Sequence, residues 1–262
     1  MNLVTLSIPA GLDMNERLLT ADQATQLLYV SNQKMDEWIR NGEIRSQESE
    51  DGLTRVWESE IINAEAQSCF QRGCELAGSP HSVDEAAWYF KKAISANPRF
   101  NLAYFELGRM YYTWGRYYEA QEPLRKSIEL NPCFPAYMNY ACNCFQWGHY
   151  HDAEQQFRNA LQIVPDNAKA IYKLAFCIMI TSFYQPDRLR ETLTYYRKAL
   201  ELRPEHEMAA WFLGETLVLH LHSFGEAGAF AQEIQDRFPY TAQHIRRIIE
   251  LNQSGFRFMH SS

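Results

Sequence analysis

The chain has 262 residues, of which 46% are hydrophobic and 14% aromatic, so it is long and apolar enough to bury a substantial core. This composition excludes a disordered protein, and the longest apolar run, Leu174 to Ile180, is far too short to span a bilayer. The N-terminus lacks the basic start of a signal peptide, and the six cysteines match no disulfide framework. We therefore expect a cytoplasmic protein with reduced thiols.

The net charge of −7 is concentrated near the N-terminus. Residues 1–62 contain eleven acidic and five basic residues, whereas the other 200 residues contain 21 acidic and 20 basic residues. This asymmetry predicts a domain boundary near residue 62. We expect an extension over residues 1–17 and a separate domain over residues 18–62, called the front domain below.

The front domain contains signals for two short helices. Thr20 and Gln23 form a capping box, which predicts a helix with Ala24, Leu27 and Leu28 facing inward. Ser31 is an expected N-cap for a second helix, whose inward residues are Met35, Trp38 and Ile39. Gly42 follows this helix, where a left-handed cap is expected.

A turn at Asp51-Gly52 predicts two strands, at about 43–46 and 53–57. The order of elements resembles the excisionase/MerR-type helix-turn-helix with a small wing, through LLTADQATQLLYVS, WIRNGEI and the RVW after the turn. The resemblance covers about 45 residues and implies DNA binding, with the second helix in the major groove. The residues that it would place on DNA are Asn32, Gln33, Lys34, Arg40, Arg45 and Arg55.

The charges of the front domain favour a different role. Asp36 and Glu37 lie on the outward face of the second helix, where they would meet phosphates. Two hypotheses follow. In the first, the front domain binds DNA. In the second, it contacts another protein or forms the first element of the repeat array.

Five prolines, at positions 98, 132, 165, 204 and 239, recur at intervals of 34, 33, 39 and 35 residues. Apolar or small residues recur at fixed distances before them. Twelve residues earlier stand Ala86, Ala120, Ala153, Thr192 and Ala227; eight earlier stand Phe90, Leu124, Phe157, Tyr196 and Ala231; five earlier stand Ala93, Ser127, Ala160, Ala199 and Ile234. Such columns predict repeated helix pairs that pack closely.

The unit at residues 101–132 resembles the tetratricopeptide repeat along its whole length, with Tyr104, Leu107, Gly108 and Tyr111 in its first helix. Gly108 would let the second helix approach, and Pro132 would end that helix. The resemblance implies a mostly α fold, a right-handed α-α superhelix of about five repeats over residues 63–239. The expected units are 66–98, 101–132, 134–165, 168–204 (with an insertion of about five residues) and 207–239.

A final helix over residues 240–252 is expected to cap the array. Ile245, Ile248 and Ile249 lie on its inner side, with polar residues on the outer side. The last residues, 253–262, are expected to form a flexible tail.

The first helices of such arrays line a concave groove, so the resemblance implies a partner site there. The expected groove residues are Phe105, Arg109, Tyr112, Met138, Asn139, Phe145, Lys169, Tyr172, Lys173, Phe176, Met208, Trp211 and Glu215, with Leu102, Cys142, Met179 and Val218 beside them. Asn139, Lys169 and Lys173 match three of the five positions with which co-chaperones of this family hold a peptide carboxylate. The remaining two positions are Phe105 and Arg109. The alternative is that both lysines are solvated, and the chain's own tail or a second copy could also fill the groove.

Metal and catalytic motifs are not expected. Cys142 and Cys144, and likewise His149 and His151, are two residues apart, so on a helix they point to opposite sides. We find no P-loop, nucleophile elbow, zinc-protease or dinucleotide motif. The sequence predicts a non-enzymatic, bacterial-type adaptor without a cofactor that captures a peptide or helix of another protein. The alternative is a transcription regulator with its front domain on DNA.

Overall fold

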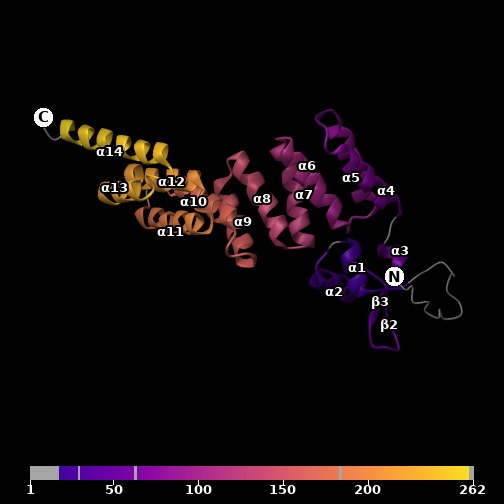
Figure 1. The fold of residues 1–262 in the computed structure, drawn as a ribbon. Helices are drawn as coiled ribbons and strands as arrows, with labels where there is room; N and C mark the ends of the chain where they lie inside the picture. The colour runs from indigo at the N-terminus through magenta and orange to yellow at the C-terminus, as the bar shows by residue number, and fades with distance from the viewer. Residues whose placement is uncertain (1–17, 29, 62–63, 183–184, 260–262) are drawn as a thin grey trace. The chain divides into compact units, whose positions relative to one another are not determined.

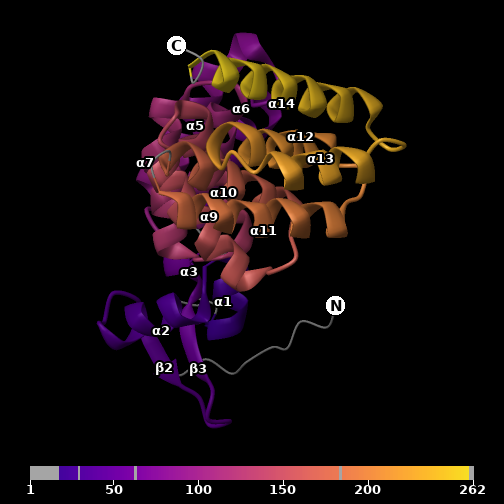
Figure 2. The same cartoon turned by 90° about the vertical axis from the view of Figure 1, so that its left-hand side faces the viewer.

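The computed structural model describes residues 18–28, 30–61, 64–182 and 185–259, and these residues are mostly helical (Figures 1 and 2). The chain divides into two compact units, residues 1–132 and 133–262. None of the helices in the described ranges is long and apolar enough to cross a membrane. The N-terminal extension, 1–17, lies outside the described residues.

The first unit begins with short strands and helices and continues with helix pairs (Figure 1). Its elements are β1 (Leu18–Thr20), α1 (Ala21–Leu28), α2 (Asn32–Arg40), β2 (Ser46–Glu48), β3 (Thr54–Trp57), α3 (Glu58–Ile61), α4 (Ala64–Leu76), the 3-10 turn η1 (Pro80–Ser82), α5 (Val83–Ala96), α6 (Asn101–Thr113) and α7 (Tyr117–Leu130).

The second unit is helical throughout its described residues. Its elements are α8 (Phe134–Trp147), α9 (Tyr150–Ile163), α10 (Ala168–Thr181), α11 (Pro186–Leu202), α12 (Glu207–Glu215), the π-helical turn η2 (Thr216–His220), α13 (Phe224–Glu233) and α14 (Pro239–Met259).

The caps predicted in the front domain are confirmed. The Gln23 side chain accepts from the Thr20 N–H (2.9 Å), and the Thr20 hydroxyl accepts from the Gln23 N–H (3.2 Å). The Ser31 hydroxyl accepts from the Lys34 N–H at the start of α2. Gly42 and Gly52 both have positive φ, after α2 and in the turn before β3. The local turn chemistry therefore follows directly from the sequence.

The strands differ from the expectation. β2 begins at Ser46, because the N–H groups of Glu43 and Ile44 both donate to Trp38 O and extend the cap of α2. β1 was not predicted; it pairs antiparallel with β3, giving the strand order β1-β3-β2. Leu27 was expected to face inward, but it is 40% exposed, because Ala24 and Leu28 already fill the buried side of α1.

The front domain shares its core with the first repeats. Leu130, at the end of α7, is buried in the same cluster as Met35 and Trp38 of α2. The Ser31 N–H donates to Leu130 O (3.4 Å), and Arg99 Nη2 donates to Glu43 O (2.7 Å). The guanidinium of Arg99 also lies over the Trp38 ring. The start of α2 therefore contacts the end of a repeat helix.

The repeat pattern is confirmed in the packing. Pro98, Pro132, Pro165 and Pro204 each follow the last residue of α5, α7, α9 or α11 by two positions. All fifteen residues of the three predicted columns are buried, fourteen of them completely. Gly108 is required for the close crossing of α6 and α7, because a Cβ there would lie 2.6 Å from Leu124 Cγ. The superhelix and the number of units stay predictions.

The irregular units depart from the pattern in specific ways. The insertion in the fourth unit lengthens α11 to 17 residues, against 14 in α9, so part of it forms an additional helical turn. In the fifth unit, α12 continues into the π-helical turn η2, and α13 has only 10 residues. The irregularity of the fifth unit thus begins at Thr216.

The final helix packs as predicted but is longer. Ile245 is buried, and Ile248 and Ile249 pack against the same cluster of α12 and α13. α14 extends to Met259, whereas a tail was expected from residue 253. No proline interrupts this stretch, and the Ser254 hydroxyl donates to Glu250 O within the helix. Residues 260–262 lie outside the described residues.

Candidate partner-binding site

Four aromatic side chains from three successive first helices of the second unit contact one another. They are Phe145 of α8, Tyr172 and Phe176 of α10, and Phe212 of α12, and we call them the aromatic ladder. The ring centroids of Phe145 and Phe176 are 5.3 Å apart, and those of Phe176 and Phe212 are 5.0 Å apart in an edge-to-face arrangement. All four rings are partly exposed. Tilted and edge-to-face contacts of this kind are favourable between aromatic rings.

Buried residues of the second helices support the ladder. Tyr172 contacts Tyr196 of α11, which is completely buried, and Phe145 contacts Tyr150 and the buried Phe157 of α9. The ladder therefore rests on the repeat core and presents its other side outward. Its rings are fixed by neighbours rather than freely mobile in solvent.

A lysine lies at the Phe145 end of the ladder. Lys173 Nζ is 3.8 Å from the centroid of the Phe145 ring, a cation–π contact. Burial lowers the pKa of Lys173, and the nearby charge of Lys169 lowers it further. Among the described residues, neither lysine has a carboxylate within ion-pair distance. Asn139 is partly buried on α8, and Lys169 is exposed on α10.

The other end of the predicted groove is partly covered by α14. Trp211 stacks on His244 of α14, with ring centroids 3.8 Å apart and planes at 14°. Glu215 Oε1 lies 3.2 Å from His244 Nε2. Only Met208, at the start of α12, is widely exposed (49%). Phe212, the residue after Trp211, is the one whose ring contacts Tyr172 and Phe176 of α10.

Three residues expected to line the groove are instead in the core. Cys142, Met179 and Val218 are all buried. The Met179 sulfur accepts from the Thr216 hydroxyl at 3.3 Å, so its side chain points toward the next unit of the array. At Met179 the covering contact comes from the following repeat, and the periodicity of a single helix does not reveal such contacts.

Phe212 and His244 were not singled out in the sequence. Phe212 follows its repeat proline, Pro204, by eight residues, as Lys173 follows Pro165. Because Lys173 was predicted to line the groove, the same spacing from the repeat proline would have predicted Phe212 there as well. His244 gave no such signal, because its contacts depend on how α14 packs onto α12.

Three predicted groove residues lie in the first unit. Phe105 and Tyr112 are partly buried, and the Tyr112 ring contacts Tyr117. The Arg109 guanidinium donates to Glu106 through both Nε and Nη2. Its donor fork is therefore engaged within α6. Leu102 is partly buried and packs against the cluster that includes Phe100 and Ala103.

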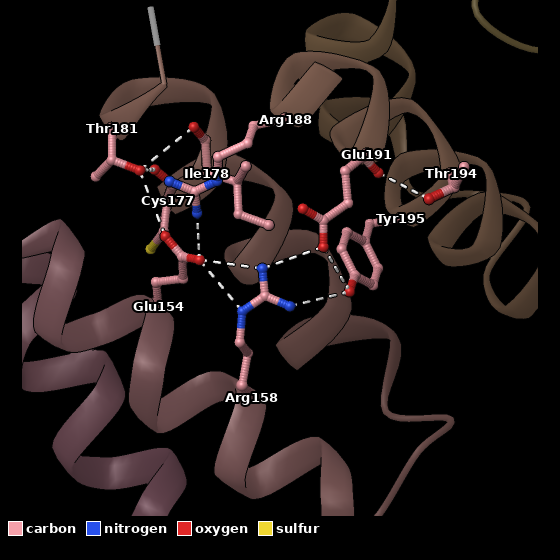
Figure 3. Close-up of polar contacts among 9 residues, drawn as sticks. All are labelled: Glu154, Arg158, Cys177, Ile178, Thr181, Arg188, Glu191, Thr194 and Tyr195. Atoms are coloured by element: carbon pink, nitrogen blue, oxygen red, sulfur yellow. Dashed lines mark hydrogen bonds and ion pairs between the residues drawn. The ribbon is translucent and has the colours of Figure 1, made fainter. Parts of the chain in front are cut away.

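A second group of polar side chains joins α9, α10 and α11 (Figure 3). The buried carboxylate of Glu154 accepts from Arg158 Nη2 (3.0 Å), from Arg188 Nη2 (2.6 Å) and from the Thr181 hydroxyl (3.4 Å). Arg158 also donates to Glu191, and Arg188 comes from the additional turn of α11. Every charge in this network has an opposite partner, so removal of one would leave another charge uncompensated, and the network leaves no group for a ligand.

Of the six residues predicted to contact DNA, Arg55 is largely buried, and most of the six are engaged within the front domain. Lys34 pairs with Glu37, Arg40 Nε donates to Asp36 O, and Arg55 pairs with Asp51. Arg45 lies over the Trp57 ring. Asn32 and Gln33 are exposed at the start of α2.

Four of the six cysteines are buried. Cys144 and Cys177 are completely buried, and burial raises the pKa of each to about 12. Cys74 is exposed on α4. Over the described part of the chain, no group of three His, Cys, Asp or Glu side chains is arranged to hold a metal ion.

Comparison with known proteins identifies the repeats. Residues 102–132 and 134–167 match the tetratricopeptide repeat family model. No curated protein sequence matches the chain. Among solved structures, MamA is similar with a TM-score of 0.60 and 19% identity, covering 70% of this chain and 96% of MamA. YrrB, a tetratricopeptide repeat protein with an unusual peptide-binding site, is similar with a TM-score of 0.59 and 16% identity, covering 68% of this chain and 90% of YrrB.

A third structure, MamA from residue 41 to the end from Desulfovibrio magneticus RS-1, has a TM-score of 0.55 and 19% identity, covering 74% of this chain and 98% of that one. At these identities the similarity concerns the fold alone. The chain therefore contains tetratricopeptide repeats and has the fold of tetratricopeptide repeat proteins.

Proposed function

We propose that the chain is a non-enzymatic adaptor of the cytoplasm, of bacterial type, that captures a peptide or helix of another protein on the aromatic ladder. The observation that carries this proposal is the ladder with Lys173 at its end. A half-buried ammonium without a carboxylate partner weakens the fold, so its presence is better explained by an anionic group of a ligand. Tetratricopeptide repeat folds commonly serve protein interaction, which supports the same conclusion.

The partner's chemistry follows from the ladder. Rings that are partly exposed offer apolar area, and burying one large side chain contributes about 1.5–3 kcal/mol. We therefore expect one or two apolar or aromatic anchors on the partner. An acidic group beside them would meet Lys173, Lys169 and Asn139, the positions that resemble a carboxylate clamp.

Quantitative capture from the native cytosol tests this proposal. Lys169→Glu with Lys173→Glu reverses the charge at the end of the ladder, and Phe176→Ala removes its central ring. Arg190→Glu with Arg197→Glu is the matched control, because both arginines are exposed on α11, which contributes none of the ladder rings. We expect one set of proteins to be lost with both ladder variants and retained with the control. Retention by all variants, with unchanged circular dichroism, would exclude the ladder as the site.

For the front domain, we propose that it forms the first element of the repeat array. The contacts of Leu130 with the α2 cluster, and of Arg99 with Glu43 and Trp38, support this role. Leu130→Ala should therefore destabilise the front domain and α7 together in hydrogen exchange. Loss of protection in α7 alone would contradict the proposal.

The helix-turn-helix reading gives the second candidate function, a DNA-binding regulator. The exposure of Asn32 and Gln33 at the start of α2 favours it, since such helices read bases with their first residues. Against it, the same end of α2 contacts α7, where the carboxylate of Glu129 lies near Lys34. A low-salt binding assay with random duplex and the full chain separates the two. Binding that Asn32→Ala with Gln33→Ala abolishes would establish the regulator.

A further inference from the structure

Helix α12 begins with a histidine as its N-cap. The His206 side chain accepts from the Ala209 N–H through Nδ1 at 3.3 Å, and the carbonyl oxygen of His206 shares the same N–H at 3.0 Å. Shared bonds of this kind are common at helix ends. Histidine is not among the residues that N-cap positions favour, which are Ser, Thr, Asp and Asn. The cap alone therefore does not explain why a histidine stands here.

The preceding repeat has an asparagine at the equivalent position. Asn167 stands two residues after Pro165, as His206 stands two residues after Pro204. The Asn167 side-chain oxygen accepts from the Ala170 N–H at 3.0 Å and caps α10. The cap thus needs only one acceptor, which an amide oxygen provides. The histidine adds two features that the asparagine lacks, an aromatic ring and a second ring nitrogen.

The His206 ring contacts the aromatic ladder. Its centroid is 4.6 Å from that of Tyr172, and the Tyr172 ring is 6.3 Å from that of Phe212. Because Nδ1 accepts the Ala209 N–H, the proton of the neutral ring is on Nε2. Within the described residues, Nε2 makes no hydrogen bond of its own. An N–H donor that has no acceptor therefore lies beside a ring of the ladder.

The charge around His206 is opposite to the charge at the Phe145 end of the ladder. Glu205 and Glu207 flank His206 in the sequence, and both are exposed, whereas the Phe145 end has Lys173. A carboxylate that approached His206 would be repelled by the two glutamates, but a neutral carbonyl oxygen would not. The donor at His206 therefore suits a neutral acceptor, such as a main-chain carbonyl or the side-chain amide of Asn or Gln.

We propose that His206 is a hydrogen-bond donor of the partner site, and that its Nε2–H binds a neutral carbonyl oxygen of the captured segment. This inference rests on the proposed function, because it requires the ladder to be the site. The segment then binds in one direction, with its acidic group at Lys173, its apolar anchor on the ladder and its carbonyl group at His206. The site thus selects the order of these three groups as well as their presence.

An NMR experiment on the ligand-free wild type tests the donor itself. Long-range proton–nitrogen correlation in the histidine rings of the full chain, at pH 8, shows which ring nitrogen carries the proton. His206→Asn assigns the His206 signals by their absence. We expect a proton on Nε2 of His206 and none on Nδ1, and a proton on Nδ1 overturns the inference. This measurement involves no capture, so its result is independent of the proposed function.

Two small probes test the preference for a neutral carbonyl. N-acetylphenylalaninamide has an aromatic ring with neutral carbonyl groups, and hydrocinnamate has an aromatic ring with a carboxylate. His206→Asn keeps an acceptor for the cap, as Asn167 does in α10, but removes the Nε2–H. We expect this variant to bind the amide probe about fivefold more weakly, as for the loss of one hydrogen bond, and the carboxylate probe less than about twofold more weakly. His81→Asn, the same change at an exposed histidine of η1, is the matched control and should bind both probes as the wild type does.

The difference between the two probes isolates the hydrogen bond, because loss of the ring contact with Tyr172 affects both probes. An equal loss for both probes, or no loss for the amide probe, overturns the inference and leaves the ladder as the site. If the wild type binds neither probe, the proposed function is contradicted and the inference is overturned with it. The NMR measurement uses the wild type, so it decides the position of the proton even where the His206→Asn variant is unstable.

Discussion

Replacing Gly108 by alanine tests how closely α6 and α7 must approach. A Cβ at this position would lie 2.6 Å from Leu124 Cγ, 2.7 Å from Leu124 Cδ2 and 3.1 Å from Leu124 N. Leu124 is completely buried, and its Cγ and backbone nitrogen are not the flexible end of a side chain. The two helices must therefore separate by several tenths of an ångström to admit the methyl group.

The expected cost follows from two opposing terms. Overpacking a well-packed core costs about 1–3 kcal/mol. Alanine favours a helix over glycine by about 1 kcal/mol, which offsets part of this cost. We expect Gly108→Ala to lower the free energy of unfolding by up to about 2 kcal/mol. Each kcal/mol lost should lower the unfolding midpoint by about 2–4 °C in a chain of this size.

Thermal unfolding followed by circular dichroism measures the change, and hydrogen exchange shows whether α6 and α7 lose protection first. Gly228→Ala in α13 is the matched control, because a Cβ at that helical position meets nothing within 4 Å. The control should gain stability from helix propensity alone. Equal stabilisation by both substitutions would refute the argument, since it would mean that the crossing of α6 and α7 has room for a methyl group.

Three further results are expected. Glu154→Gln weakens the charged hydrogen bonds from two arginines and should destabilise the chain by about 1–3 kcal/mol, measured by urea unfolding; an unchanged midpoint would show that the network contributes nothing. Lys173→Met should raise the unfolding temperature at pH 7, because the folded chain holds the lysine proton less tightly than the unfolded chain. For the same reason the wild type should become more stable as the pH rises toward 10.5, where the lysine loses its proton. The Lys173→Met variant should lack this increase in stability. In a thiol-labelling experiment at pH 8, Cys74 should react in the native protein, while Cys144 and Cys177, each with a pKa of about 12, should react only after unfolding.

The repeat core could be predicted from sequence because it depends on local spacing. Ala120, Leu124 and Ser127 precede Pro132 by fixed distances, and each is buried because the helical period places it on one face. The caps at Thr20 and Ser31 were equally predictable, since each involves residues only three positions apart.

The candidate site was predictable only in part, because its exposure depends on contacts between repeats. Phe145, Tyr172 and Phe176 come together as their spacing suggests, but Met179 is covered by the following repeat. Trp211 is partly covered by α14, and Ile245 of α14 packs against Gly214 of α12. The sequence pattern of a single helix does not predict such contacts between elements that are far apart in the sequence.

The burial of Leu130 has a consequence for how this protein can be divided. Leu130 stands two residues before its repeat proline and is 3% exposed, whereas Ile163 and Leu202, at the same position of later repeats, are 48% and 39% exposed. The difference is the front domain, whose core includes Leu130. A truncation at residue 62 would leave both fragments with an uncovered apolar surface. The smallest portable module that carries the front domain therefore extends to the end of α7, and exchange of this domain between proteins would have to include the first repeats with it.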